Sequence, residues 1–347
     1  MSPAGVDVDV LVAGGGPVGL AVALMAVRAG LSATVVERRC APVDKACGEG
    51  LMPSAVDALR GLGLAPAGRP FHGIRYVDAA GGRSVQARFA AGPGLGVRRT
   101  ELHRCLADAA DAAGVHRVSG VVEDVRQSGG VVQAAGRSAR WLVAADGLHS
   151  TVRRELGLDR PPNARRRYGL RRHFAAAPWS DLVEVHWSTS AEAYVTPVSS
   201  SVVGVAVLTG ARGVSFEDHL RQFPLLAAHL AGAEPVSSVR GAGPLGQAAS
   251  RRVAGRVLLV GDAAGYVDAL TGEGIAVGLA QAAALVECLA DGRPQAYEQA
   301  WRHVSRRSRL LTQAVLYAAQ HHRLRSRLVP AAAGAPALFR AAVDALA

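Results

Sequence analysis

The stretch that decides the fold reads Val8-Asp9-Val10-Leu11-Val12-Ala13-Gly14-Gly15-Gly16-Pro17-Val18-Gly19. The apolar run before the glycines predicts a buried strand, and residues 20–29 have the character of a helix that stops at Gly30. A second strand is expected over residues 33–37, and it ends in Glu37, 18 residues after Gly19. Strand, glycine turn, helix and strand ending in an acid form the complete fingerprint of a dinucleotide-binding unit.

Each residue type in this fingerprint has a physical task. Gly14 permits the tight turn, Gly16 lets the backbone approach a pyrophosphate, and Gly19 lets the helix lie close to the strand. Pro17 suits the first helical turn, because its missing N–H would have no partner there. The helix N-terminus offers free N–H groups to phosphates, and Glu37 is expected to accept hydrogen bonds from ribose hydroxyls.

A second glycine motif, Gly241-Ala242-Gly243-Pro244-Leu245-Gly246, does not predict a second site. Only residues 247–254 separate it from the next turn and strand, and Arg251-Arg252 leaves no apolar helix long enough to cross a sheet. One nucleotide site is therefore expected. A nicotinamide cofactor would have to bind without a Rossmann domain of its own.

Two later segments indicate which dinucleotide is bound. Residues 141–153 read as a strand that ends in Ala145-Asp146-Gly147-Leu148-His149-Ser150-Thr151-Val152-Arg153, and residues 256–265 as a strand that ends in Gly261-Asp262-Ala263-Ala264. Together with the N-terminal glycine turn, these resemble the three signature motifs of flavoproteins with the p-hydroxybenzoate hydroxylase fold. The resemblance runs from Val8 to about Leu289, in the family's order and spacing. It implies FAD as the cofactor.

The resemblance also implies an architecture. The fold class is α/β, with a Rossmann-like FAD-binding domain, an interleaved and mostly antiparallel β-sheet substrate domain, and C-terminal helices. The expected division of the chain is residues 1–69, 97–164 and 246–296 for the FAD-binding domain, 70–96 and 165–245 for the substrate-binding sheet, and 297–347 for the C-terminal helical segment.

Residues across the motifs are expected to contact FAD. Asp262, at a strand end, can accept a hydrogen bond from a ribityl hydroxyl. Thr271-Gly272-Glu273-Gly274-Ile275 opens a helix whose N-terminus would stabilise negative charge on the N1–C2=O side of reduced flavin. The expected cofactor residues are Gly14, Gly16, Pro17, Gly19, Glu37, Arg38, Lys45, Arg99, Asp146, Gly261, Asp262, Gly272, Gly274 and Ile275.

One segment resembles a particular branch of the family. Asp44-Lys45-Ala46-Cys47-Gly48-Glu49-Gly50-Leu51 is similar to the K-x-C-G segment of geranylgeranyl reductases, in which the cysteine lies near the isoalloxazine. Cys47 is therefore either a flavin neighbour or a small buried hydrophobe. Lys45 is expected to contact FAD, and Arg99 resembles the start of the family's R-x-x-L helix, whose arginine reaches the phosphate–ribose region. In the segment Asp268-Ala269-Leu270, which resembles the family's flavin-facing loop, Ala269 departs from the usual proline.

Alternating segments between the cofactor motifs supply the candidate substrate residues. Residues 71–89, with Gly81-Gly82 as the turn, predict a hairpin, and residues 168–208 predict further strands. In the family these strands close over the reactive face of the flavin. The candidate substrate contacts are Arg172, His173, Trp187 and Tyr194. The candidate catalytic residues are Cys47, Glu184, His186 and Tyr194. Glu184 and His186 share a strand face, so they are either an acid–base pair or simply exposed residues.

Composition excludes several other classes of protein. The chain has 347 residues, of which 50% are hydrophobic and 19% charged, as in folded globular proteins. The four cysteines show neither the spacing nor the histidine partners of a disulfide framework or zinc site, so a reduced, cytoplasmic and metal-free protein is expected. No signal peptide is recognised at the N-terminus, and acidic residues interrupt the apolar stretch from Val257 to Ala290.

The charge is strongly positive, with 39 Lys+Arg against 28 Asp+Glu and a net charge of +11. Lys45 is the only lysine, so the positive charge resides in scattered arginines. The sequence shows neither a DNA-recognition helix nor a set of aromatic residues for base stacking, so nucleic-acid binding is not predicted. The segment from Tyr297 has a helical pattern with arginines from Arg302 to Arg327. We expect it to pack on its own domain, the alternative being contact with a membrane surface or an acidic partner.

The predicted function is an FAD-dependent monooxygenase that uses NADH or NADPH. By the family resemblance, it would hydroxylate a hydrophobic or aromatic small molecule through a flavin C4a-hydroperoxide, in keeping with secondary metabolism. The alternative is a reductase like the geranylgeranyl reductases, which delivers hydride to an isolated C=C bond. A halogenase is not expected, since Trp179 and Trp187 lie too far apart for a W-x-W-x-I-P motif. A more remote alternative is a basic nucleic-acid or membrane-binding protein.

Overall fold

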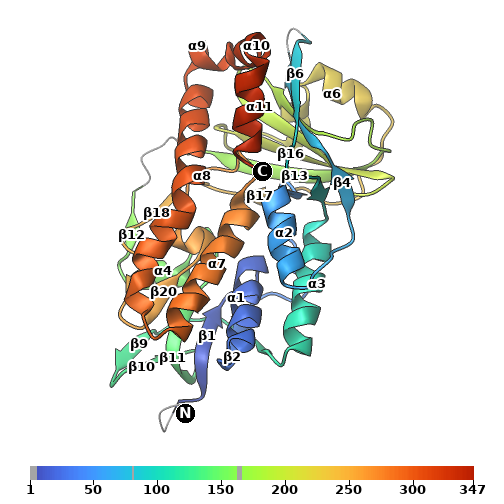
Figure 1. The fold of residues 1–347 in the computed structure, drawn as a ribbon. Helices are drawn as coiled ribbons and strands as arrows, with labels where there is room; N and C mark the ends of the chain where they lie inside the picture. Colours follow the sequence, from blue (N-terminus) through green and yellow to red (C-terminus); the bar gives the residue numbers. More distant parts are fainter. Residues whose placement is uncertain (1–5, 80–81, 162–165) are drawn as a thin grey trace.

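The computed structural model describes residues 6–79, 82–161 and 166–347. One layer is an eight-stranded sheet whose main path runs in the order β19-β20-β11-β1-β2-β8 (Figure 1). Its central strand β1 (Val8–Ala13) pairs in parallel with β2 (Ala33–Glu37) and β11 (Arg137–Ala144). Every residue of β1 is buried, as expected for a parallel strand covered on both faces. The remaining strands are β8 (His116–Ser119), β9 (Arg126–Ser128), β10 (Val131–Ala134), β19 (Val253–Ala254) and β20 (Val257–Leu259).

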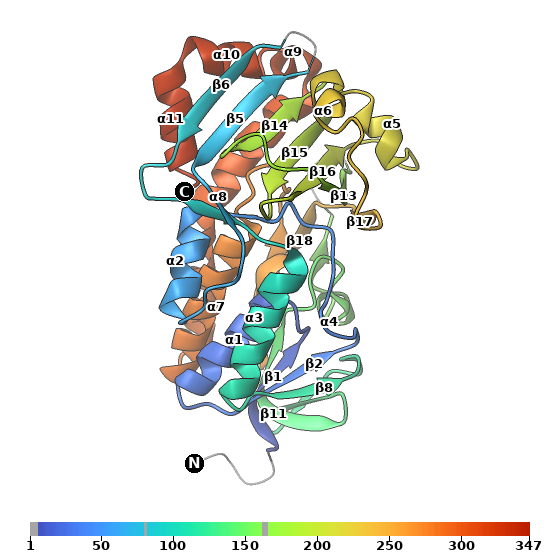
Figure 2. The same ribbon diagram turned by 90° about the vertical axis from the view of Figure 1, so that its right-hand side faces the viewer.

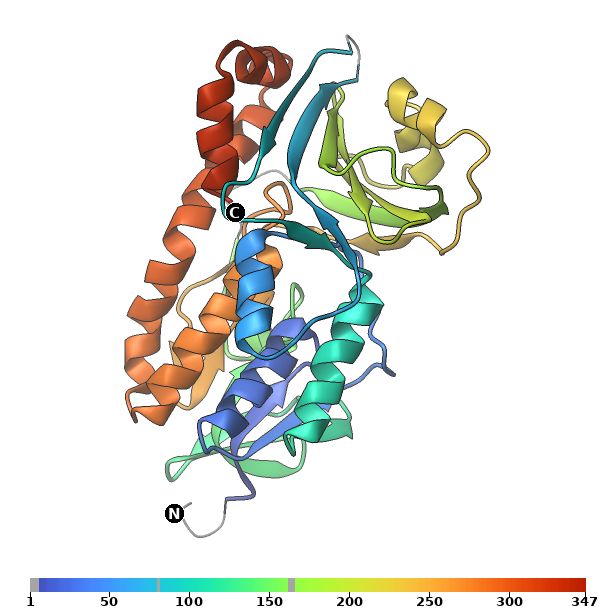
Figure 3. The same cartoon turned by 45° about the vertical axis from the view of Figure 1, so that its right-hand side comes forward.

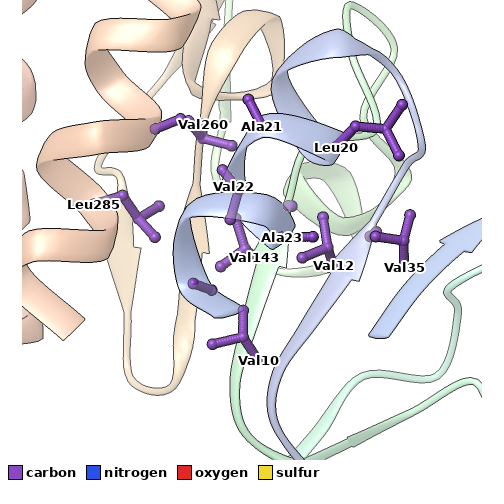
Figure 4. Close-up of a cluster of buried hydrophobic side chains, with 14 of the residues drawn as sticks. Val10, Val12, Leu20, Ala21, Val22, Ala23, Val35, Val143, Val260 and Leu285 are labelled. Carbon is purple, nitrogen blue, oxygen red and sulfur yellow. The ribbon is translucent and has the colours of Figure 1, made fainter. Parts of the chain in front are cut away.

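Helices α1 (Pro17–Arg28), α3 (Arg99–Ala112) and α7 (Gly274–Ala290) pack around this sheet. Figure 4 shows the apolar contact between α1, α7 and the strands, with Val22 and Leu285 beside Val143 and Val260. Helix α7 lies very close to α1, because a Cβ added to Gly278 would meet Val18 Cγ2 at 2.5 Å. The first strand–turn–helix–strand unit is thus confirmed, and its helix begins at Pro17.

The second layer is a seven-stranded sheet in the order β17-β13-β16-β15-β14-β5-β6 (Figure 2). All of its pairs are antiparallel except β14 with β5, which confirms the mostly antiparallel sheet. Its strands are β5 (Gly73–Asp78), β6 (Ser84–Arg88), β13 (Tyr168–Ala175), β14 (Val183–Trp187), β15 (Ala191–Pro197), β16 (Val202–Thr209) and β17 (Arg240–Ala242). In the predicted hairpin, Gly82 belongs to the turn between β5 and β6, whereas Gly81 lies outside the described residues.

Two small sheets connect the layers. One comprises β3 (Gly50–Leu51), β7 (Gly94–Gly96) and β4 (Arg69–Phe71), and the other β12 (Asp159–Arg160), β18 (Gln247–Ala249) and β21 (Gly265–Tyr266). Short helices fill the connections: α2 (Pro53–Gly61), α4 (Thr151–Glu155), α5 (Phe216–Leu220), α6 (Pro224–His229) and the 3₁₀ turns η1 (Gly261–Ala264) and η2 (Pro294–Ala296). The second glycine motif leads from β17 into β18 without a helix, as expected.

The C-terminal segment is helical: α8 (Tyr297–Gln320), α9 (His322–Arg325), α10 (Leu328–Gly334) and α11 (Pro336–Asp344). Helix α8 packs along α7 and extends toward the second sheet, where α10 and α11 lie against β6 (Figure 3). Arg325, grouped by the sequence with the other tail arginines, is buried. Within the described residues no helix is long and apolar enough to cross a membrane. The expected domain boundary between residues 164 and 165 falls outside the described residues.

Candidate functional site

A continuous cavity extends from the glycine turn to the seven-stranded sheet. At one end it is lined by Gly14, Gly16, Pro17, Glu37, Arg39, Arg99 and Asp146, which come from the Rossmann-like layer. At the other end the lining includes side chains of β5, β14, β15 and β16. The cavity therefore joins the elements that carry the nucleotide fingerprint to the sheet expected to bind substrate. Arg38 is exposed and outside the lining, whereas its neighbour Arg39 belongs to it.

The glycine turn forms a close-packed backbone cradle. Gly14 has φ +103°, and a Cβ there would lie 2.6 Å from the Ala145 carbonyl oxygen. A Cβ on Gly19 would lie 1.9 Å from the oxygen of Gly14. Helix α1 has no side-chain cap, so its first N–H groups remain available to an anion. The Gly15 N–H donates to Glu37 Oε2 at 2.8 Å, which fixes that carboxylate beside the turn.

Asp146 presents an unused acceptor toward the same end of the cavity. Its Oδ2 accepts hydrogen bonds from the N–H groups of Thr151 (2.8 Å) and Val152 (3.2 Å) and so caps α4. Its Oδ1 is buried without a hydrogen-bond partner among the described residues. Since buried polar atoms are rarely left unpaired, this oxygen points to a ligand donor.

Arg153 joins the Asp146 segment to the Asp262 segment. Its buried guanidinium donates to the carbonyl oxygens of Leu148 (3.1 Å) and Ala263 (3.0 Å). The last residue of the second signature motif therefore holds the third motif in place. Asp262 itself lines the cavity, as do Lys45 and Gly261. Burial lowers the pKa of the Lys45 ammonium, Arg99 acts in the same direction, and the Asp262 carboxylate opposes them.

The N-terminus of α7 faces the middle of the cavity. Gly272, Gly274 and Ile275 line it, and α7 has no side-chain cap. Gly272 has φ +71°, a conformation that glycine adopts without strain. Glu273 turns away from this position, because Ser308 Oγ on α8 donates to its Oε2 at 2.9 Å, and burial raises the pKa of this carboxyl. The free helix end can stabilise negative charge in the cavity.

Glu49 organises a buried cluster that the sequence did not identify as a site. Its Oε1 accepts a hydrogen bond from the Arg99 N–H at 2.8 Å, and its Oε2 lies 2.5 Å from His173 Nε2. The Arg171 guanidinium hydrogen-bonds Asp44 and lies 3.2 Å from His173 Nδ1. Glu49 itself has φ +60°. The cluster fixes the 44–51 segment, and hence Lys45 and Cys47, against β13.

The candidate substrate and catalytic residues fall into two groups. Cys47 and Tyr194 line the cavity, and the Tyr194 hydroxyl donates to the Leu270 carbonyl oxygen at 2.9 Å. Burial raises the pKa of the Tyr194 phenol well above its ordinary value. Arg172 pairs instead with Glu217, His173 lies behind Glu49, and Trp187 packs on Tyr76 with ring centroids 5.4 Å apart; these three are not among the lining residues.

Glu184 and His186 form the expected pair but not in the cavity. Their side chains are buried, with His186 Nε2 3.1 Å from Glu184 Oε2 and Trp179 Nε1 donating to the same oxygen at 3.1 Å. Burial opposes ionisation, but these hydrogen bonds lower the pKa of Glu184. The intervening residues Val183 and Val185 line the cavity instead. The pair lies on the opposite face of β14, because successive side chains of a strand alternate.

Comparison with known proteins agrees with this geometry. A family model described as an FAD binding domain matches residues 7–318. The chain belongs to this FAD-binding family. A menaquinone reductase from Mycolicibacterium smegmatis is 31% identical over 332 residues, covering 84% of this flavoprotein and 79% of the relative. A digeranylgeranylglycerophospholipid reductase from Methanothermobacter thermautotrophicus is 28% identical over 301 residues, covering 79% and 74%.

Other relatives share part of the chain or the fold. A 3-amino-4-hydroxybenzoate 2-monooxygenase from Streptomyces platensis is 34% identical over 175 residues, covering 44% of the flavoprotein and 42% of the relative. The solved structure of a flavin-dependent brominase superposes with a TM-score of 0.79 at 18% identity, covering 97% and 98% of the two chains. The p-hydroxybenzoate hydroxylase fold and an FAD-dependent oxidoreductase are thereby established.

The residues of the cavity fit FAD. The close glycine turn and the uncapped end of α1 suit the pyrophosphate, and Asp146 Oδ1 supplies a free buried acceptor. Lys45 and the N-terminus of α7 place positive charge in the same cavity, where they would stabilise the negative charge of a reduced flavin. In the described residues no cluster of His, Cys, Asp and Glu has the arrangement of a metal site.

The far end of the cavity is mainly aliphatic, and apart from Tyr194 its residues were not named as substrate contacts from the sequence. The lining there includes Ile74, Val183, Val185, Ala206, Leu208, Leu245, Leu270 and Leu346. The alternating pattern of β14 contained a signal for this surface, but it did not indicate which face points inward. The assignment depends on β5 pairing with β14 and on the C-terminus reaching the same place.

Proposed function

We propose that this flavoprotein reduces an isolated C=C bond in a lipophilic substrate of the polyprenyl type, with NADH or NADPH as the electron source. The supporting observation is the apolar end of the cavity, formed by side chains of β5, β14 and β16 and by Leu346. The polar residues of β14, Glu184 and His186, lie outside it. Such a wall can bind a hydrocarbon chain by removing its surface from water.

The relatives support the same substrate class. The reductases named above cover 84% and 79% of the chain, whereas the monooxygenase relative covers 44% of it. Menaquinones and digeranylgeranylglycerophospholipids both carry polyprenyl chains. A substrate of this type is consistent with a cavity that is polar near the nucleotide end and apolar beneath the second sheet.

The roles of the protein's own groups follow from their positions. The glycine turn and Asp146 would bind the cofactor, and Lys45 with the end of α7 would stabilise negative charge on it. Bound FAD would supply two-electron transfer between the nicotinamide and the double bond. The Tyr194–Leu270 hydrogen bond positions the flavin-facing loop, and the apolar wall excludes water. The substrate gains two hydrogens overall as NAD(P)H becomes NAD(P)⁺ and one proton is taken up.

Turnover without oxygen tests this proposal. The purified flavoprotein is incubated with NADPH or NADH and a menaquinone or a geranylgeranyl lipid, with and without labelled O₂. We expect equal turnover in both conditions and a product heavier by two hydrogens that contains no label. A product that forms only with oxygen and carries the label would contradict reduction. Protein carrying Gly19→Ala, in which the new Cβ would meet the backbone of the turn, is the control for cofactor-dependent turnover.

Hydroxylation of a hydrophobic or aromatic molecule is the second candidate. The monooxygenase relative and the aromatic lining residues Tyr76, Tyr194 and Tyr266 favour it. Labelled oxygen in the product of the same experiment is the outcome that would select it.

A further inference from the structure

The C-terminal helices present a surface that none of the functions above uses. Residues 299–343 contain eight arginines and no aspartate or glutamate. Two of these arginines are directed inward: Arg325 is buried, and Arg309 lies over the Trp301 ring at 5.3 Å. The other arginines are exposed. The stretch is therefore a concentrated source of positive potential on a chain whose remaining charge is dispersed.

The exposed residues of α8 follow one stripe of the helix. Its buried residues Trp301, Ser305, Thr312, Leu316 and Ala319 pack on the protein. The opposite stripe carries Arg302, Arg306, Arg307, Leu310 and Tyr317, which we call the α8 face. Arg323, Leu324 and Arg327 follow in and after α9, at the end of α8 (Figure 1). The spacing of three or four residues keeps each set on one side of the helix.

The exposed arginines of the α8 face and of the segment in and after α9 form few ion pairs within the protein. Arg302 pairs with Glu298 at 3.2 Å. Arg306, Arg307, Arg323 and Arg327 form no ion pair with any residue in the ranges 6–79, 82–161 and 166–347, although the charge of Arg307 helps to lower the pKa of Glu273 against the effect of burial. Their charge is thus available to an external anion.

Large apolar side chains are exposed among these arginines. Leu338, Tyr317 and Leu310 are 72%, 60% and 57% exposed, more than any other large apolar side chain of the described residues. All three lie in the C-terminal helices. A surface that only attracted dissolved polyanions would not need these apolar side chains. Arginine combined with leucine and tyrosine on one helix face is instead the chemistry of an anionic lipid surface, where the apolar groups enter the interface and the charges meet the headgroups.

The C-terminal segment also reaches the apolar end of the cavity. Leu346 lines the cavity, and the Phe339 ring of α11 lies 4.9 Å from the ring of Tyr76, another lining residue. Arg325 forms an ion pair with Glu192 of β15 at 2.6 Å. The segment that carries the α8 face is therefore fixed to the sheet that would hold a lipophilic substrate.

We propose that the α8 face docks this flavoprotein peripherally on an anionic lipid bilayer. The contact would give the protein access to a substrate dissolved in the membrane, and this role rests on the proposed function. The docking itself does not depend on the proposed function. Docking through arginines and a few apolar side chains is reversible and depends on salt, and no part of the chain needs to cross the bilayer.

Vesicle co-sedimentation tests the proposal on the full-length, FAD-loaded protein. Vesicles of phosphatidylcholine alone are compared with vesicles that also contain phosphatidylglycerol, at low and physiological salt. We expect binding only to the anionic vesicles, and R306E/R307E to weaken it by more than about tenfold. L310S/Y317S should also weaken binding but leave its salt dependence unchanged, because the charges remain.

The control has the same change in charge at a distance from α8. R104E/R212E replaces exposed arginines on α3 and in the loop before α5 and should bind vesicles like the wild type. Flavin absorbance checks that each variant is folded. Equal binding by wild type and R306E/R307E, or no binding to anionic vesicles, would overturn the proposal. Retention of DNA but not of vesicles, lost in R306E/R307E, would overturn it in favour of a nucleic-acid partner.

The two proposals fail separately. Vesicle binding is scored without turnover, and C=C reduction is scored with a detergent-solubilised substrate that needs no bilayer. R306E/R307E should keep that detergent activity, since neither arginine lines the cavity.

Discussion

At the scale of single residues, Glu49 is the group whose removal tests the site most directly. Its carboxylate contacts the Arg99 N–H and His173 while almost fully buried, at 3% exposure. We expect Glu49→Ala to lower the free energy of unfolding by about 3 kcal/mol, because a buried donor, a histidine and the neighbouring arginine lose their acceptor. Denaturant unfolding measures this loss.

Glu49→Gln is the matched control, since an amide keeps the shape and one acceptor of the carboxylate. It should cost less than Glu49→Ala. The affinity for FAD, titrated by flavin fluorescence, should fall more in the alanine variant, because Lys45 and Cys47 lie on the segment that the cluster holds. If Glu49→Ala unfolds at the same denaturant concentration as the wild type, the cluster does not stabilise the loop.

At the scale of elements, the packing of α7 on α1 is set by one glycine. A Cβ on Gly278 would approach Val18 Cγ2 to 2.5 Å, so Gly278→Ala forces the helices apart or Val18 into another rotamer. We expect a loss of about 1–2 kcal/mol in unfolding free energy, after the better helix propensity of alanine has offset part of the clash. Val18 lines the cavity, so FAD affinity should fall as well.

The double variant Gly278→Ala/Val18→Ala identifies the cause. Truncating Val18 removes the atom that the new Cβ meets, so the double variant should be more stable than the sum of the single effects implies. Additive losses would show that the two side chains do not interact. Unfolding free energies of all four proteins measure the coupling.

Elements and motifs were predictable from sequence to different degrees. The strands 8–13 and 33–37 agree with the structure to within a residue, because local periodicity and glycine punctuation determine them. Each of the three cofactor motifs is a continuous run of residues that can be recognised by itself, and the three runs meet in one cavity. Glu49 and His173 are 124 residues apart, and no local pattern pairs them. The inward face of β14 was equally hidden, since alternation is symmetric between faces.

At the scale of the whole molecule, a chain of buried ion pairs joins the tail to the flavin-facing loop. Arg325 of α9 pairs with Glu192 of β15 at 2.6 Å, Glu192 pairs with Arg167 at 2.6 Å, and Arg167 pairs with Asp268 at 3.1 Å. Asp268 is the first residue of the flavin-facing loop, in which the Leu270 carbonyl oxygen accepts a hydrogen bond from the Tyr194 hydroxyl. Helix, sheet and cofactor loop are thus coupled through charges that are screened very little by water.

The charge of Asp268 makes this coupling sensitive to pH. Burial raises the pKa of its carboxyl from 3.8 to about 6, and Glu192 acts in the same direction against the nearby Arg167. Because the folded state holds this proton more tightly than the unfolded chain does, its contribution to stability is complete below the ordinary pKa. It is lost as the pH rises through the folded value.

We therefore expect the wild type to lose at most about 3 kcal/mol relative to Asp268→Asn as the pH rises from about 4 to 7. An asparagine cannot titrate, so the variant lacks this pH-dependent contribution while keeping the size of the side chain. Denaturant unfolding of both FAD-saturated proteins across this range measures the difference. A constant difference would mean that Asp268 stays ionised throughout, with Arg167 outweighing burial. In that case the ion-pair chain from α9 to the flavin-facing loop would stay intact at every pH in the range.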